Sequence, residues 1–125
     1  MDTQCWLWMD AAPERFSDRS RALVEANDSE LFLSAASAWE IAIKHALGKL
    51  RLPAPPAESL PPLMVKTGVT PLPVLHGHAF RAAELPPHHR DPFDRMLIAQ
   101  AQHERVPILT ADRVFGRYDV EILTA

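Results

Sequence analysis

The sequence predicts an α/β fold in which short, mostly parallel strands alternate with amphipathic helices. The run Leu31–Leu33 is wholly apolar and Val106–Thr110 nearly so, and polar residues bound both, as expected for strands buried on both faces of a parallel sheet. Apolar residues recur at helical spacing after the first run and before the second. Such strands pair in parallel through right-handed crossovers, and sites form beyond their carboxyl ends.

Composition favours one domain over residues 1–125. Hydrophobic residues make up 47% of the chain and charged residues 23%, which is ordinary for a globular protein and too apolar for disorder. No apolar run approaches the ~20 residues of a membrane span, and the N-terminus lacks a signal-peptide pattern, so we expect a cytoplasmic protein with no membrane contact. A single cysteine, Cys5, excludes an internal disulfide and a thiolate zinc cluster.

The formal net charge of −3 argues against a broadly basic surface for nucleic acid. Contact with nucleic acid would therefore need a local basic patch or a metal ion. Six basic residues lie close in sequence to the candidate acids described below and could hold phosphates, although charges on helix surfaces are usually only solvated. They are Lys44, Lys49, Arg51, Arg90, Arg95 and Arg113.

Two helices flank the first apolar run. Ser17 can cap a helix from Asp18 to about Ala26. The second helix follows Leu33 and ends near Gly48, a suitable C′ residue. Its expected apolar stripe consists of Trp39, Ala42, Ile43, Ala46 and Leu47.

Glu40 lies near the start of this second helix, directly after a buried strand. The pattern Ser37-x-x-Glu40 matches a capping box, and Glu40 with Lys44 is a favourable i,i+4 pair. Taken alone, these structural roles explain Glu40 without a function.

The middle of the chain is rich in proline. Five prolines between Leu50 and Pro62 predict an extended loop or lid, then a short helix that starts near Pro62 and ends before Gly68. Prolines in the following segment 69–74 restrict it to an edge strand. A helix over 78–85 comes next and stops at a Pro-Pro pair.

The stretch from Arg90 to Ala101 carries the next acids, with a helix whose first position is Pro92. Asp91 stands at the expected N-cap and Asp94 in the first turn, before an apolar face of Leu97, Ile98 and Ala101. Capping explains Asp91 fully. Asp94 lies one turn before Leu97 and on the same side of the helix, so its carboxylate should lie at the edge of the core.

Histidines surround this helix start but form no clear site. His88 and His89 are adjacent, and side chains next to each other on an extended loop point apart. An exposed polar loop is therefore favoured over a metal site, and the same holds for His76 and His78. After the helix, Asp112 follows the second apolar run directly, and 120–123 predicts a last short strand.

Four acids can meet where these elements end. Glu40 and Asp112 each follow a buried strand, Asp94 opens the helix that leads into the second one, and Asp2 precedes the apolar block Cys5–Met9. Carboxylates ~5 Å apart repel by about 3 kcal/mol per pair at an effective dielectric near 20. A hard cation, Mg²⁺ or Mn²⁺, would offset this repulsion and could activate water against a phosphodiester.

The residues resemble PIN-domain toxins of the VapC type. The similarity covers nearly the whole chain in the right order, through the blocks 31–44, 48–53, 81–86, 89–101 and 109–115. It implies a three-layer α/β/α sandwich, a metal-dependent ribonuclease of a type II toxin–antitoxin system, frequent homodimerisation and inhibition by a VapB-type antitoxin. By position, the implied catalytic and metal-binding acids are Asp2, Glu40, Asp94 and Asp112, with Thr110 in support and Thr3 and Ser37 as weaker candidates.

One departure concerns the N-terminus. Members of this family usually begin with an apolar strand that delivers the first acid in an Asp-Thr-His sequence, whereas here only Met1 precedes Asp2 and Gln4 takes the histidine position. Either the true start lies upstream, or the chain has a missing or truncated first strand and holds Asp2 on a mobile terminus. Folding and metal binding should then be weaker than with that strand restored.

Three functions compete. The first is a metal-dependent endoribonuclease toxin, and the second is a catalytically weak PIN-like module that binds an antitoxin or partner chain. An ordered Asp2 near the other acids favours the enzyme. The third, a receiver-like phosphoryl-accepting domain, expects a lysine after a late strand, where Arg113 follows Asp112 here.

The Trp6–Met9 block and Trp39 could form a dimer surface or antitoxin groove, although such aromatics are more often core.

Overall fold

The computed structural model describes all residues from Met1 to Ala125. Its four strands form two parallel pairs. β1 (Phe32–Ser34) pairs with β2 (Thr70–Leu72), and β3 (Ile108–Thr110) pairs with β4 (Ile122–Thr124). The α/β class and the parallel pairing are therefore confirmed, and β2 is an edge strand as its prolines require.

Helices separate the strands. They are α1 (Thr3–Ala11), α2 (Asp18–Glu25), α3 (Ala35–Ala46), α4 (Pro56–Thr67), α5 (His76–Glu84) and α6 (Pro92–Glu104), with short 3₁₀ helices at Pro13–Arg15 and Arg113–Arg117. None of the helices combines the length and the apolar character needed to cross a bilayer.

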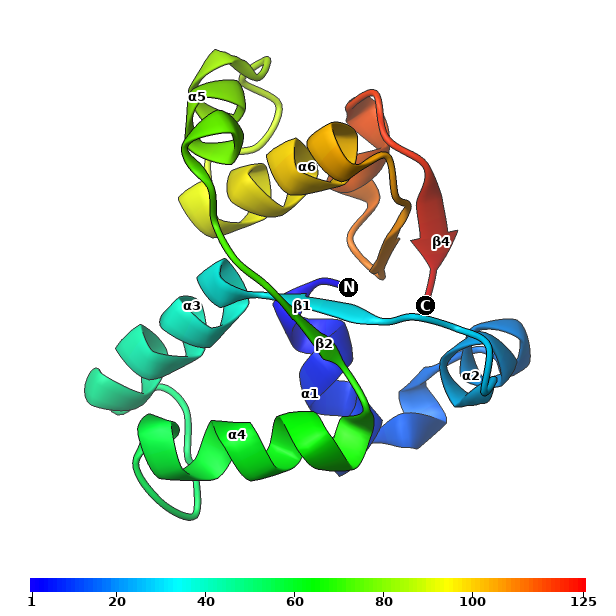
Figure 1. Cartoon of the computed structure of the whole chain (residues 1–125), viewed down its shortest axis with the longest axis vertical. Helices are drawn as coiled ribbons and strands as arrows, with labels where there is room; N and C mark the ends of the chain where they lie inside the picture. The colour runs from blue at the N-terminus through cyan, green and yellow to red at the C-terminus, as the bar shows by residue number, and fades with distance from the viewer.

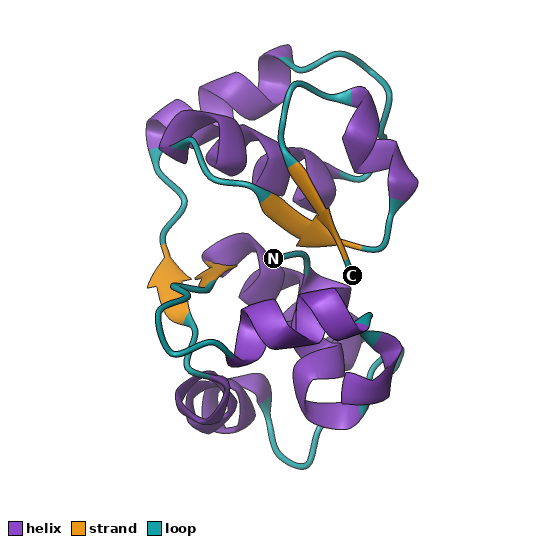
Figure 2. Ribbon diagram, turned by 90° about the vertical axis from the view of Figure 1, so that its right-hand side faces the viewer, coloured by secondary structure: helices purple, strands orange, loops and turns teal.

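The two strand pairs lie apart, and the N-terminus lies between them (Figure 2). Met1 donates its terminal N–H to the Phe32 carbonyl of β1 at 3.1 Å, and Asp2 donates its backbone N–H to the Leu109 carbonyl of β3 at 3.0 Å. Successive residues that bond to opposite neighbours are what a central parallel strand provides. Met1 and Asp2 thus bridge β1 and β3, and a cavity of about 240 Å³ lined mainly by apolar residues lies beside Met1 between these two strands.

Asp2 is fixed rather than mobile. Its exposed fraction is 7%, and its side chain caps α1 by accepting a hydrogen bond from the Cys5 N–H at 2.8 Å. The expectation of a mobile Asp2 is therefore wrong, because helix capping and the bond to β3 hold this residue.

Two main cores support the fold. One joins α6, β3 and the 3₁₀ helix at Arg113–Arg117 through Ile98, Ile108 and Phe115. The other joins α1, α3 and α4 to β1 through Trp6, Ile41 and Leu33. Trp6 is fully buried, so the prediction that the N-terminal aromatics are core holds for this residue.

The proline-rich segment is more helical than expected. α4 starts at Pro56 and continues through Pro61 and Pro62, so the predicted loop up to Pro62 is wrong. Proline in a helix removes the hydrogen bond to the carbonyl four residues earlier. Here those earlier residues, Ala57 and Glu58, are exposed, while Leu60 is buried in the core. Burial of α4 against the core outweighs the lost bonds.

α3 turns a different face inward from the one predicted. Trp39 and Leu47 are each 64% exposed, whereas Ser37, Glu40 and Ile41 are buried. The predicted inward position of Trp39 and Leu47 is wrong, because α3 turns Ser37 and Glu40 inward, where both contact the Thr3 hydroxyl.

Helix ends agree better with the sequence. Ser17 caps α2, Asp91 caps α6 by accepting from the Phe93 and Asp94 N–H groups, and Gly48 follows α3 with φ of 73°. The capping box is the exception. α3 is capped by Ser34, whose hydroxyl accepts from the Ala36 N–H at 3.0 Å.

Candidate active site

Asp94 shows that the predicted acids approach one another. The pKa of the Asp94 carboxyl is raised to about 7, mainly by burial and next by the Asp91 carboxylate, and the carboxylates of Glu40 and Asp2 act in the same direction. His89 opposes the shift. Two acids from other segments, Glu40 on α3 and Asp2 at the N-cap of α1, thus act on Asp94, together with Asp91 at the N-cap of its own helix.

Asp2 and Asp112 are joined through Thr110. The Thr110 hydroxyl donates to one carboxylate oxygen of Asp2, while the other oxygen accepts from the Cys5 N–H. The same hydroxyl oxygen accepts from the Asp112 N–H at 3.0 Å. Thr110 at the end of β3 therefore lies where the supporting residue was predicted and orients both acids.

Glu40 is held by two partners instead of a capping box. It is 6% exposed, and its Oε1 accepts from the Thr3 hydroxyl at 2.7 Å. Its Oε2 forms an ion pair with the Lys44 Nζ, also at 2.7 Å, which confirms the i,i+4 pair. The hydrogen bond from Lys44 to Glu40 raises the pKa of the Lys44 ammonium. Ser37 lies 2.9 Å from the Thr3 hydroxyl, so both weaker candidates serve to position Glu40.

His89 is the residue that sequence reasoning missed. Its Nε2 lies 2.9 Å from Asp94 Oδ2 and 3.3 Å from Asp112 Oδ2, and the side chain is only 16% exposed. Its Nδ1 accepts from the Asp91 N–H at 3.2 Å, which places the proton of a neutral ring on Nε2. The predicted exposed loop is wrong for His89, because this ring joins two of the acids.

A network around Arg95 fixes the loop that carries His89. The Arg95 guanidinium donates to the backbone carbonyls of Ala82, Leu85, Pro86 and His89 at 2.8 to 3.4 Å. The Tyr118 hydroxyl accepts from the His89 N–H at 2.7 Å and donates to the Pro86 carbonyl at 2.9 Å. The donors of Arg95 are thereby engaged, so the expectation that Arg95 holds a phosphate is wrong.

The donor set suits a hard divalent cation. Ligand atoms of His89, Asp94 and Asp112 all lie within 4.8 Å of one another. The carboxylate oxygens of Asp94 and Asp112 suit Mg²⁺ or Mn²⁺. The Nε2 of His89, which carries the ring proton, holds these two carboxylates near each other instead of offering a lone pair. The carboxylates of Asp2 and Glu40 lie outside this group; the first bonds to Thr110 and the Cys5 N–H, and the second to Thr3 and Lys44. Burial is the main cause of the raised pKa of Asp94, and the neighbouring carboxylates add to it; a bound cation would favour the ionised form.

A second cluster of His78, His103 and Glu104 is structural. His78 is fully buried, so its predicted exposure is wrong. Its Nδ1 accepts from the Leu75 N–H at 3.0 Å, and its Nε2 lies 2.9 Å from Glu104 Oε1. Since both ring nitrogens are already bonded, His78 has no lone pair free for a metal.

Comparison with known proteins agrees with this architecture. A model of the PIN domain matches residues 1–121. Ribonuclease VapC16 from Mycobacterium tuberculosis (strain ATCC 25618 / H37Rv) is 48% identical over 61 residues, which are 49% of this chain and 43% of that relative. The match thus spans less than half the length of that protein. Because the PIN match covers nearly every residue, the chain belongs to the PIN domain family.

Proposed function

We propose that this chain is a metal-dependent endoribonuclease toxin of the VapC type, and that Asp2, Glu40, Asp94 and Asp112 are its catalytic and metal-binding residues. The observation that carries the proposal is the meeting of Asp94 from α6 and Asp112 from the end of β3 at His89 Nε2. Asp2 joins the end of β3 through Thr110, and Thr3, next to Asp2 in the sequence, bonds to Glu40 on α3. Similarity to a relative named a ribonuclease supports the choice of RNA as substrate. The whole chain would act as one domain.

Asp94 and Asp112, with Asp2 beside them, would hold Mg²⁺ or Mn²⁺. When bound, such an ion lowers the pKa of water and stabilises charge on a phosphate. The residues of the chain prepare the pocket for it: Thr110 orients Asp2 and Asp112, and His89 holds Asp94 and Asp112 together through its Nε2.

Glu40 can assist as a general base because it is fixed next to the pocket. Thr3 and Lys44 hold its two oxygens in place. Lys44 is half-exposed, so its ammonium can also meet an incoming phosphate. The site therefore combines the buried carboxylates of Asp2 and Glu40 and the partly exposed ones of Asp94 and Asp112 with an accessible cation.

The alternative of a catalytically weak binding module predicts a displaced Asp2. Asp2 instead bonds with Thr110 and the Cys5 N–H, which supports the enzyme. A VapB-type antitoxin as inhibitor, a homodimer and action in the cytoplasm, where transcripts are found, belong to the same proposal. Sedimentation and co-expression with an antitoxin would test the assembly.

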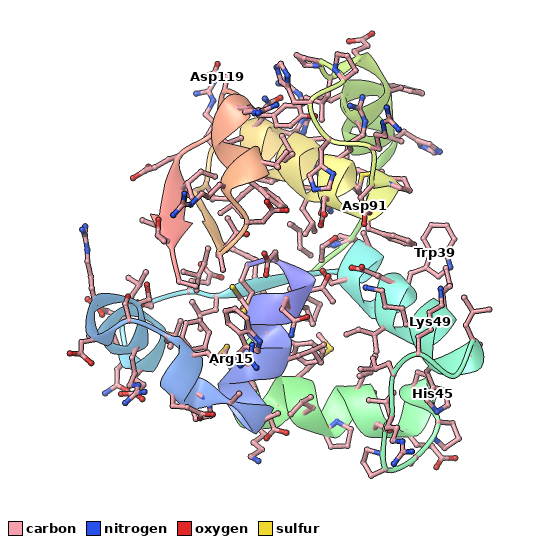
Figure 3. All side chains as sticks on the ribbon, turned by 180° about the vertical axis from the view of Figure 1, so that it is seen from behind. Arg15, Trp39, His45, Lys49, Asp91 and Asp119 are labelled. Carbon is pink, nitrogen blue, oxygen red and sulfur yellow. The ribbon has the colours of Figure 1, made fainter.

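The test is cleavage of a mixed structured RNA by the purified chain in Mg²⁺ or Mn²⁺. EDTA and Asp94→Asn should each reduce cleavage at least about 100-fold, since even partners of metal ligands contribute 10–100-fold. Asp119→Asn is the matched control, because Asp119 lies on the surface away from Asp91 and the start of α6 (Figure 3). Cleavage that persists in EDTA or in Asp94→Asn would refute the proposed site.

A further inference from the structure

Trp39 is an unusual residue on α3. Its side chain is 64% exposed, and it belongs to none of the buried clusters. One contact orients it: the Trp39 and Phe93 rings meet edge to face, with centroids 5.3 Å apart and planes at 75°. A large aromatic group is therefore held in a defined orientation while most of its surface faces water.

This aromatic pair lies beside the acids. Trp39 directly precedes Glu40 on α3, and Phe93 directly precedes Asp94 on α6. The two rings are therefore in contact where α3 and α6 meet, and the same two helices carry Glu40 and Asp94. Trp39 and Asp91 lie close together on one side of the molecule in Figure 3. A group stacked on Trp39 would thus be a neighbour of the pocket.

Cations continue from Trp39 along α3. Lys44 is half-exposed, and Lys49 is exposed just past the helix end. Lys49 and His45 lie along the same side as Trp39 in Figure 3. A positive track with an aromatic platform is how proteins bind single-stranded nucleic acid, because the phosphates meet the cations and the bases stack on the rings.

The surroundings of Trp39 favour a nucleobase over an apolar helix. Of the other strongly exposed apolar side chains, Val65 and Phe80 are on α4 and α5, while Leu47 lies at the end of α3. Between Trp39 and Leu47, α3 also carries Glu40 and the half-exposed Lys44, so charged side chains border Trp39. A flat ring in charged surroundings suits one stacked base with phosphates on either side.

We propose that Trp39, supported by Phe93, forms a subsite that stacks one unpaired base of the RNA beside the catalytic acids. The inference rests on the proposed function and deepens it, because it selects unpaired RNA segments over duplex. Bases inside a duplex are already stacked and cannot lie on the indole.

Binding of short RNAs tests this subsite in EDTA, where cleavage is blocked. The probes are an unstructured fluorescent octanucleotide, the same strand annealed to its complement, and an abasic backbone of equal length. Trp39→Ala should weaken binding of the unstructured RNA by roughly 5- to 150-fold, as for stacked bases elsewhere. Trp39→Phe should retain most of the affinity. Duplex and abasic backbone should bind equally to wild type and Trp39→Ala.

Phe80→Ala is the matched control, because Phe80 is 68% exposed on α5 and should leave binding unchanged. Equal affinity of wild type and Trp39→Ala, or an equal loss for the abasic backbone, would overturn the subsite. A change of oligomeric state in Trp39→Ala without a change in RNA binding would assign the surface to a protein partner and also overturn it.

The two proposals fail separately. If the chain cleaves RNA in Mg²⁺ or Mn²⁺ and Trp39→Ala binds normally, the ribonuclease stands and the stacking subsite falls. If binding depends on Trp39 while no metal supports cleavage, the subsite stands and the activity falls.

Discussion

α3 and α6 both carry a candidate acid, but they are built in opposite ways. α6 follows the ordinary rule: Leu97, Ile98 and Ala101 face the core, and Asp94 lies at the first turn near the edge of that core. Its apolar spacing alone predicts both the face and the position of the acid.

α3 reverses this rule. It buries Ser37 and Glu40 and leaves Trp39 and Leu47 largely exposed. Burial of a carboxylate costs free energy unless it is paired, and here Thr3 and Lys44 supply the partners. The comparison teaches that α6 is shaped by packing, whereas α3 is shaped by the pocket it serves.

Truncation of one apolar side chain on each helix should show the largest difference between α6 and α3. Ile98→Ala on α6 should lower the free energy of unfolding by about 2–5 kcal/mol, because Ile98 is fully buried. Leu47→Ala on the exposed face of α3 should change it by less than about 0.5 kcal/mol. Urea denaturation measures both, and similar losses would break the comparison.

Filling the cavity between β1 and β3 should stabilise the contact between the core that contains α3 and the core that contains α6. An apolar extension of three or four residues ahead of Met1 would bury side chains worth about 1.5–3 kcal/mol each, less the cost of ordering them. We expect a net gain of roughly 2–3 kcal/mol and a higher melting temperature. A Gly-Ser extension of equal length is the control, and equal melting of both would contradict the prediction.

Asp94 should make stability depend on pH. Its pKa rises from the model-compound value of 3.8 to about 7 in the folded protein, so the folded chain binds this proton more tightly than the unfolded chain does. The stabilisation is full below pH 3.8, is lost progressively as pH rises to about 7, and leaves an ionised Asp94 opposing its neighbours above that. In EDTA at pH 8, Asp94→Asn should therefore be more stable than wild type by on the order of 2 kcal/mol.

At pH 4 that advantage should vanish, since wild-type Asp94 is then neutral as well. Thermal melts across this pH range measure the difference. A constant gap between the two proteins would show that Asp94 does not titrate as inferred.

Removal of the Thr3 hydroxyl should have the smallest effect of the series. Thr3→Val keeps the shape of the side chain but leaves Glu40 Oε1 without its donor, which should cost about 1–2 kcal/mol. Thr3→Ser keeps the hydroxyl and should lose less. If the two variants are equally stable, Glu40 is not held through Thr3.

How far the sequence predicts the molecule follows the same division. Local signals sufficed for α6, since the Asp91 cap and the apolar spacing are both contained in one segment. The inward face of α3 could not be predicted, because Glu40 is satisfied by Thr3, 37 residues away, and no periodicity records that contact. α4 exceeded its predicted length for a similar reason, since core contacts offset the cost of internal prolines.

The sequence analysis named the acids of the candidate site but not His89. Asp2, Glu40, Asp94 and Asp112 were expected from strand ends and helix starts; the structure places Asp94 and Asp112 at one histidine, and the role of the four acids stays a prediction. His89 depends on a loop shaped by Arg95 and Tyr118, both distant in the sequence or assigned another role. A useful signal was available: only one residue separates His89 from the Asp91 cap, so the loop cannot carry this ring far from the helix start.

Because Met1 and Asp2 bond to β1 and β3, the reactivity of the N-terminal amine can report whether these two strands separate. The terminal amine of Met1 is buried against Phe32, and burial lowers the pKa of this amine. An acylating reagent should therefore reach it only when the two strand pairs move apart, whereas the exposed Lys49 should react freely. Relative acylation of these two amines, followed by mass spectrometry, would time the opening of the gap without any introduced label.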